Sequence, residues 1–291
     1  MRTEMEKLNS VSREHERSEG ELATVEEEGE RRENHHLMTG PFDARIKRGF
    51  GMICVGPPLA GKTSFVMRLL RDRERLIDGH FDYVHWFYGE RTAAVDQLNQ
   101  EGSVKTMPGL PDNLEDYIES VDPVTGEKRH GLLIFDDLMQ NVSNSEDIIR
   151  LVSTQCQHQN ISWIVLLQNL FHQGKSRLTM LRCAHYLVLF KSPLDQSAGL
   201  HLAQRLLSSS PKTFIRIYEQ ATQEAHGYLF VDGHQKTPKE ARFRGDFFNK
   251  KRQLAYVPYA RISGNRSKKR EGLTSTTRRS KLGSGKMRVK S

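Results

Sequence analysis

Runs of consecutive apolar residues, separated by polar connections, mark the middle of the chain. Runs without alternation are typical of parallel strands that are covered on both faces. We expect such strands at 52–55, 83–88, 132–135, 161–167 and 184–190, and a terminal hairpin strand at 228–231. Apolar residues three and four positions apart predict helices after residue 61 and at 145–157, 193–207 and 211–222, with a short one at 113–120. This alternation predicts a three-layer α/β domain with a mainly parallel central sheet.

The connection between the first strand and the first helix has the sequence GPPLAGKT, residues 56–63. Two glycines separated by four residues and followed by Lys and Thr form the phosphate-binding loop pattern, and its position between a strand and a helix is the required one. Backbone N–H groups that converge at a helix N-terminus bind phosphate without many cationic side chains. The pattern therefore predicts a nucleotide site that takes ATP and Mg²⁺.

Roles within this loop follow from residue type. Gly56 and Gly61 permit the turn and the close approach of phosphate. Pro57 and Pro58 lack an N–H and stiffen the entry, so the donors are expected from the residues that follow. Those residues are Leu59, Ala60, Gly61, Lys62, Thr63 and Ser64. Lys62 is expected to reach the β- and γ-phosphate oxygens, and the Thr63 hydroxyl to ligate Mg²⁺.

Acidic and amide side chains follow two of the predicted strands. Asp136 and Asp137 end the strand 132–135, and Gln168 and Asn169 end the strand 161–167. Open α/β sheets bind ligands at the carboxyl ends of their strands. Asp136 is therefore predicted to hold the Mg²⁺ shell, and Asp137 to orient and deprotonate the attacking water. Gln168 is predicted to sense the γ-phosphate or position its water, and Asn169 to cap the sheet edge.

The segment 171–182 is rich in Gly, Lys and Arg and is predicted to be a basic loop. Arg177 or Arg182 is a candidate for an arginine that enters a neighbouring subunit's site and neutralises the transferring phosphoryl group. A solvated or DNA-facing arginine is the alternative for each. We take Arg177 as the candidate catalytic arginine.

Charge and composition divide the 291-residue chain into three parts. Residues 1–36 carry 11 Glu against 6 Lys and Arg, a net of −5, and are expected to be a charged, disordered segment. Residues 37–257 are predicted to form the nucleotide-binding domain, and 258–291 a basic disordered tail. Positions 261–291 hold 11 Lys and Arg and one Glu, a net of +10, which favours sequence-independent contact with nucleic acid. No apolar run is long enough for a membrane span, and the charged start predicts no secretory signal.

These motifs, in this order, resemble the additional-strand class of P-loop ATPases. Residues 165–174, VLLQNLFHQG, and 183–191, CAHYLVLFK, resemble the FtsK/HerA superfamily, in particular genome-packaging ATPases of the poxvirus type found in large DNA viruses, virophages and Maverick/Polinton elements. The similarity covers about residues 50–230 and neither tail. Many relatives carry Glu where Asp137 stands.

The resemblance implies a homo-oligomeric ring that uses ATP hydrolysis to drive double-stranded DNA into a capsid. Capsid or portal proteins are the further partners it implies, and an intracellular location, in the host nucleus or at a viral assembly site. Two alternatives stay open: a small-molecule or nucleoside kinase built on the same loop, and a nucleotide-gated DNA-binding scaffold with vestigial hydrolysis.

Overall fold

The computed structural model describes residues 35–37, 43–119, 121–138, 146–150, 152–153, 160–169, 175–192, 210–249 and 254–258, with the backbone alone at 35–37, 146–147 and 175–178. The chain divides into two units, Met1–Tyr259 and Ala260–Ser291, and the described residues belong to the first. The predicted helix at 193–207 and most of both predicted tails lie outside them. No helix in these ranges is both long enough and apolar enough to cross a membrane.

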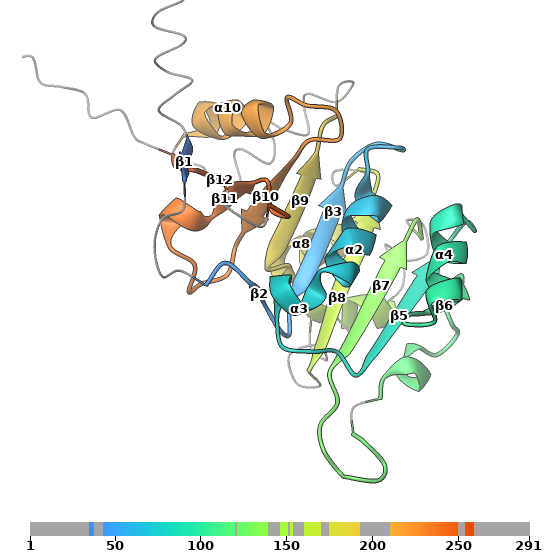
Figure 1. Ribbon diagram of the computed structural model, residues 1–291. Coiled ribbons are helices and arrows are strands. Elements are labelled where there is room, and N and C mark those ends of the chain that lie inside the picture. Colours follow the sequence, from blue (N-terminus) through green and yellow to red (C-terminus); the bar gives the residue numbers. More distant parts are fainter. Residues whose placement is uncertain are drawn as a thin grey trace, which may run out of the picture. The chain divides into compact units, whose positions relative to one another are not determined.

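Twelve strands and several helices make up the described part (Figure 1). The strands are β1 (His35–Leu37), β2 (Ile46–Lys47), β3 (Gly51–Val55), β4 (Ile77–Asp78), β5 (Tyr83–Tyr88), β6 (Lys105–Pro108), β7 (Gly131–Asp136), β8 (Ile161–Leu167), β9 (Tyr186–Phe190), β10 (Tyr228–Asp232), β11 (Phe243–Gly245) and β12 (Leu254–Tyr256). The helices are α2 (Lys62–Arg71), α3 (Arg73–Leu76), α4 (Ala93–Glu101), α6 (Glu146–Arg150), α8 (Lys175–Cys183) and α10 (Pro211–Ala221), with 3₁₀ turns η1 (Leu114–Tyr117) and η3 (Lys239–Ala241).

A ten-stranded sheet forms the middle layer, in the order β1-β12-β11-β10-β9-β3-β8-β7-β5-β6. Every neighbouring pair from β9 to β6 is parallel, and β10, β11, β12 and β1 extend the sheet with antiparallel pairs. Strand β8 lies between β3 and β7, with Val55 opposite Leu167 and Asp136 opposite Leu166. The carboxyl ends of these three strands therefore meet at one edge of the sheet.

Helices cover both faces of this sheet, as Figure 1 shows. On one face, Phe65, Val66 and Leu69 of α2 pack with the strand residues Met52 and Cys54. On the other face, residues of α6, α8 and α10 pack on the alternate strand positions; they include Ile148, Met180, Phe214 and Ile217. The three-layer α/β architecture with a mainly parallel sheet is confirmed.

The strands predicted at 83–88 and 161–167 have the predicted bounds, and β3, β7 and β9 lie within two residues of theirs. The basic loop predicted at 171–182 is wrong from residue 175 onward, because helix α8 occupies Lys175–Cys183. Met180 is completely buried, and Leu181 and Cys183 pack against the same core, so apolar burial stabilises a helix among the charges. The helix predicted at 113–120 is only the 3₁₀ turn η1, which begins with Asn113 accepting a hydrogen bond from Glu115 N.

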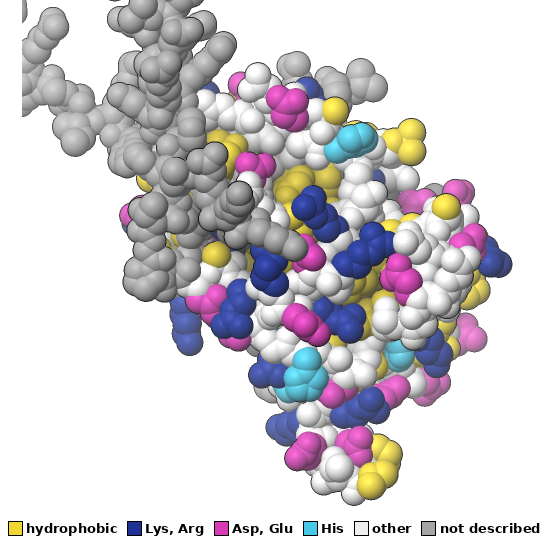
Figure 2. All heavy atoms as spheres, viewed as in Figure 1, with side chains coloured by type: hydrophobic (Ala, Val, Ile, Leu, Met, Phe, Trp, Pro, Cys, Tyr) yellow, Lys and Arg dark blue, Asp and Glu magenta, His cyan; other side chains and the backbone are white. Residues whose placement is uncertain are grey.

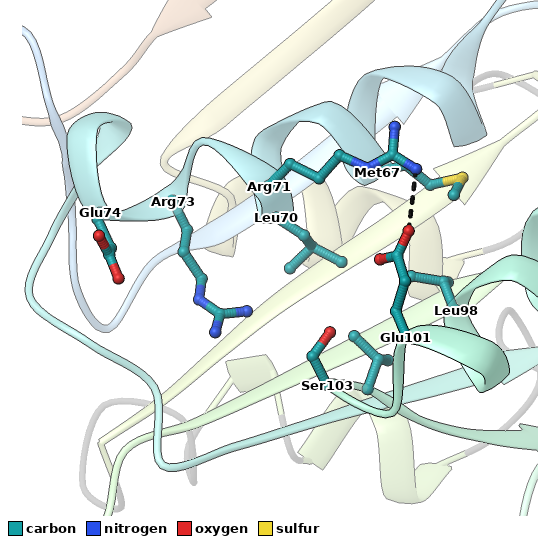
Figure 3. Close-up of a pocket in the computed structure, with 9 residues that line it drawn as sticks. Met67, Leu70, Arg71, Arg73, Glu74, Leu98, Glu101 and Ser103 are labelled. Atoms are coloured by element: carbon teal, nitrogen blue, oxygen red, sulfur yellow. Dashed lines mark hydrogen bonds and ion pairs between the residues drawn. The ribbon is translucent and has the colours of Figure 1, made fainter.

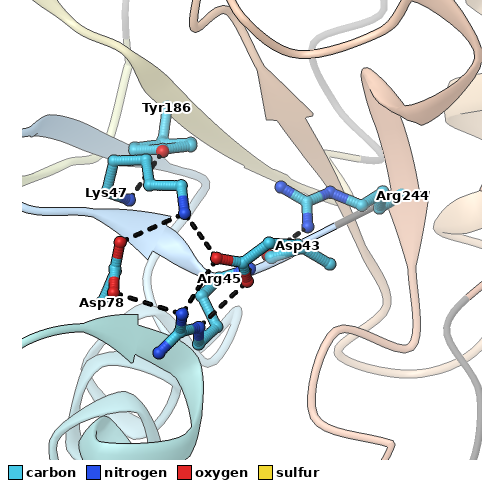
Figure 4. Close-up of polar contacts among 7 residues, drawn as sticks. Asp43, Arg45, Lys47, Asp78, Tyr186 and Arg244 are labelled. Carbon is cyan, nitrogen blue, oxygen red and sulfur yellow. Dashed lines mark hydrogen bonds and ion pairs between the residues drawn. The ribbon is translucent and has the colours of Figure 1, made fainter. Parts of the chain in front are cut away.

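A network of ion pairs anchors the chain at the amino end of the parallel strands (Figure 4). The Lys47 ammonium contacts Asp43 at 2.5 Å and Asp78 at 3.2 Å, and Arg45 contacts the same two carboxylates. These pairs are partly exposed. Beside them, Arg244 is fully buried and donates to Asp232 Oδ2 and to Ala44 O, both at 2.6 Å. The buried pair thereby ties the antiparallel extension to the segment that leads into β2.

Asp232→Ala leaves the Arg244 charge buried without its carboxylate, and we expect it to lower the free energy of unfolding by about 3–5 kcal/mol. Asp43→Ala, which removes only partly exposed pairs, is the control and should change it by no more than about 1 kcal/mol. Urea unfolding followed by circular dichroism measures both values. Equal losses in the two variants would contradict this assignment.

Candidate nucleotide-binding site

The loop between β3 and α2 has the conformation that its glycines allow. Gly61 has φ 103°, a left-handed conformation that favours glycine, and Phe65 N donates to its carbonyl at 2.9 Å, which starts helix α2. A β-carbon at Gly56 would lie 2.6 Å from Phe190 Cβ, so no larger residue fits there. Gly56 N donates to Leu167 O at 3.1 Å, which fixes the start of the loop against β8.

Lys62 lies inside this loop. Its ammonium donates to Gly56 O at 2.8 Å and to Pro57 O at 2.9 Å. Burial lowers the pKa of Lys62, and the charges of Asp136 and Asp137 oppose that shift. The cation is therefore within electrostatic reach of both predicted acids.

Asp136 ends β7 and faces the first turn of α2. The Thr63 hydroxyl donates to Asp136 Oδ2 at 3.2 Å, across 73 positions of sequence. Burial raises the pKa of Asp136 to about 6; Thr63 and Lys62 act in the opposite direction, and Asp137 adds to the rise. A hydroxyl and a carboxylate at this distance are the hard oxygen donors that Mg²⁺ prefers, so these two residues fit a Mg²⁺ site. In the described part of the chain, no group of three or more His, Cys, Asp or Glu residues is placed to hold a metal.

Asp137, the next residue, is held by both neighbouring strands. Its φ is 54°, a rare conformation for a residue other than glycine, and Gln168 Nε2 at the end of β8 donates to its Oδ1 at 2.9 Å. Directly after β5, Gly89 N donates to Asp136 O at 2.9 Å, and a β-carbon at Gly89 would lie 2.4 Å from Asp137 O. Strained backbone that several contacts hold in place is typical of functional sites.

Sequence reasoning missed Gly89, whose only signal is a lone glycine after a strand. It also missed the walls of a cavity of about 600 Å³ beside the loop. Besides loop and α2 residues, this cavity is lined by residues from four distant segments, among them Thr92, Phe190, His226, Tyr228 and Phe248. No motif connects these positions, because the strand pairing brings them together.

The predicted site residues fall into two groups. Residues 56–64, Asp136, Asp137 and Gln168 gather at the carboxyl ends of β3, β7 and β8, and Asn169 follows Gln168. Arg177 lies in the first turn of α8, and its side chain is outside the description. Arg182 is exposed at the other end of α8, just before His185, whose N–H donates to Gly51 O at the amino end of β3. Arg177 is thus at the amino end of α8 and Arg182 at its carboxyl end, and the catalytic role of either arginine stays a prediction.

Strand order, loop and adjoining acids together define a P-loop NTPase fold of the additional-strand class, with β8 as the strand between the loop strand and the acid-bearing strand. No protein-family model matches the chain, and no curated protein does.

Solved structures with a similar fold include the genome-packaging NTPase B204 of Sulfolobus turreted icosahedral virus 2, with 10% identity and a TM-score of 0.44 over 67% of this chain and 96% of that one. They also include ATPases 2 and 3 of EssC from Geobacillus thermodenitrificans, with 10% identity and a TM-score of 0.44 over 75% and 47% of the two chains. A third is the type VII secretion ATPase EccC of Thermomonospora curvata, with 9% identity and a TM-score of 0.43 over 73% and 26%.

The variant Asp136→Asn tests whether the ionised Asp136 carboxylate lowers the free energy of unfolding. Because its pKa is raised to about 6 from 3.8, the native state loses stability as the pH rises from about 4 to 6, and the penalty is complete above that range. In EDTA at pH 7.5, we expect Asp136→Asn to raise the free energy of unfolding by about 1–3 kcal/mol. At pH 4 we expect little change. Urea unfolding at both pH values measures this, and a variant that is no more stable than wild type at pH 7.5 would contradict the burial argument.

Proposed function

We propose that this chain is an ATP-hydrolysing motor that moves double-stranded DNA into a capsid. The observation that carries the ATPase part is the hydrogen bond between Thr63 and Asp136, because it brings the loop's hydroxyl and the strand-end carboxylate to one ligand position. The motifs at 165–174 and 183–191, with their resemblance to packaging ATPases, support the DNA part.

Phosphate binding follows from the loop. The N–H groups of residues 59–64 surround the β- and γ-phosphates at the N-terminus of α2, a ten-residue helix. Lys62 exchanges its contacts with Gly56 O and Pro57 O for the phosphate oxygens. Thr63 and Asp136 would hold Mg²⁺, which when bound neutralises charge on the β- and γ-phosphates.

Hydrolysis requires a water in line with the γ-phosphate. Asp137 is the general base in this proposal: it takes a proton from the water as the water oxygen bonds to the γ-phosphorus and the bond to the ADP oxygen breaks. Gln168 fixes the Asp137 carboxylate through its 2.9 Å hydrogen bond and thereby sets the direction from which the proton is taken. Catalysis here consists of positioning and charge neutralisation.

The rival kinase hypothesis uses the same loop but needs neither a second acid nor the amide that holds it. The contact between Gln168 and Asp137 therefore favours hydrolysis over transfer to a small acceptor.

The DNA contact of the motor is assigned to loops and to the basic C-terminal tail. Figure 2 shows basic and acidic side chains interspersed on the visible face of the described part. In the sequence, Arg71, Arg73 and Arg75 alternate with Asp72 and Glu74.

Steady-state ATP turnover, with and without duplex DNA, tests the motor. Wild type should hydrolyse ATP faster with DNA, and Lys62→Ala should lose turnover because the phosphates lose their cation. Asp137→Asn should lose at least about tenfold in turnover but keep nucleotide binding, since it removes only the proton acceptor. Unchanged turnover in Asp137→Asn would exclude this residue as the base, and DNA binding without any turnover would favour the nucleotide-gated scaffold.

Mixing two inactive variants tests whether sites are completed by a neighbouring subunit. If Arg177 acts in trans, Arg177→Ala subunits have intact nucleotide loops, and Lys62→Ala subunits can supply the arginine. We expect turnover to reappear in the mixture and to be absent from each variant alone. A mixture as inactive as its parts, under conditions where both variants assemble, would contradict the trans role of Arg177.

A further inference from the structure

The cavity beside the phosphate-binding loop is continuous with the predicted phosphate site. Its volume of about 600 Å³ is in the range of small-molecule sites, and Lys62, Thr63 and Ser64 form part of its wall. The triphosphate itself needs only the loop, the strand ends and the first turn of α2. The remaining space lies along α2 toward Arg68, beyond the residues that bind phosphate.

The far wall of this cavity is aromatic. Phe65 of α2 contacts Tyr228 and Phe248, with ring centroids 4.9 Å apart in each case, and Phe190 lies 5.6 Å from Tyr228. These rings pack on one another at interplanar angles of 80°, 63° and 47°. Burial among them raises the pKa of the Tyr228 hydroxyl, which stays neutral.

Arg68 lies on this wall. Its guanidinium carbon is 4.5 Å from the centre of the Phe248 ring, and the side chain is exposed and lines the cavity. A guanidinium that rests on a ring is a planar, preorganised platform, and its second face can stack on another planar group.

His226 closes the cavity near the loop. It has φ 58°, and its Cβ and Nδ1 lie 3.6 and 3.7 Å from the position that a β-carbon would take on Gly61. The strained turn therefore places an imidazole directly beside the glycine that precedes α2. A left-handed conformation at a residue other than glycine is an observation that suggests a functional constraint.

We propose that this cavity holds the nucleoside half of the nucleotide, with the base stacked on the Arg68 guanidinium and His226 at the phosphate end. This inference rests on the proposed function, because it presumes that the loop binds the triphosphate. Beyond the loop and α2, the described lining residues are Thr92, Ala93, Ala94, Phe190, His226, Tyr228 and Phe248, and none of them carries the amide or carboxylate group that pairs with two atoms of a base edge at once. The site therefore selects by stacking area: ATP and GTP should bind within about tenfold of each other, and pyrimidine triphosphates more weakly.

Inorganic tripolyphosphate, which has no nucleoside, separates the two halves of the site. Arg68→Ala should weaken Mg·ATP binding by about tenfold and leave tripolyphosphate binding unchanged, because only the nucleoside stacks. Arg68→Lys keeps the charge but loses the planar group, and it should weaken ATP binding as much as Arg68→Ala does.

Arg71→Ala is the matched control. Arg71 lies on the same helix but lines a separate groove between α2 and α4, where it forms an ion pair with Glu101 at 3.2 Å (Figure 3). Isothermal titration calorimetry with both ligands should find this variant equal to wild type. Equal losses for ATP and tripolyphosphate in Arg68→Ala, or no loss for ATP, would overturn the nucleoside assignment. Failure of wild type to bind either ligand would instead refute the proposed function.

Discussion

The hydrogen bond from Thr63 to Asp136 joins the first turn of α2 to the end of β7. Helix α2 follows β3, and β8 lies between β3 and β7 in the sheet. It can form only if β3, β8 and β7 are parallel and in register, so that all three end at one edge. Burial of the apolar strand residues from both faces fixes that register, because a shift would expose core residues. The position of one hydroxyl and one carboxylate thus depends on the whole central sheet.

The positions of Asp136 and Asp137 lower the stability of the folded protein, and contacts elsewhere in the fold offset that loss. Asp136 is a partly buried acid whose pKa is raised to about 6, and Asp137 has a positive φ, which is rare for a residue other than glycine. Contacts from α2, β5 and β8 hold both residues in place. The ten-stranded sheet and the buried pair of Arg244 and Asp232 supply stability at a distance from the site. The two residues that are unfavourable for folding are also the ones to which the proposed function assigns Mg²⁺ and the attacking water.

Much of this architecture is predictable from the sequence because its determinants are local. Uninterrupted apolar runs give the parallel strands, and the loop pattern between 56 and 63 gives the strand–helix junction. Asp136 and Gln168 could be expected near one another since carboxyl ends of parallel strands align. Helix α8 was not predictable in this way, because its buried residues are few and lie among charges.

The cavity wall was not predictable for a different reason. Arg68, Tyr228 and Phe248 come together only through the antiparallel strands beyond β9 and the segment that follows β11, and the local sequence does not specify which strands pair. Long-range pairing is decided by the total burial of the sheet, so residues that meet through it carry no shared motif.

A double-mutant cycle on Mg²⁺-dependent ATP affinity tests the shared site most directly. With Thr63→Val, Asp136→Asn and the double variant, calorimetric titrations in Mg²⁺ should give at least about a tenfold loss for each single change and little more for the pair, because both residues serve one ion. In EDTA, the three variants should bind ATP about as wild type does. Additive losses, or losses of the same size without Mg²⁺, would contradict the claim that Thr63 and Asp136 form a single magnesium site.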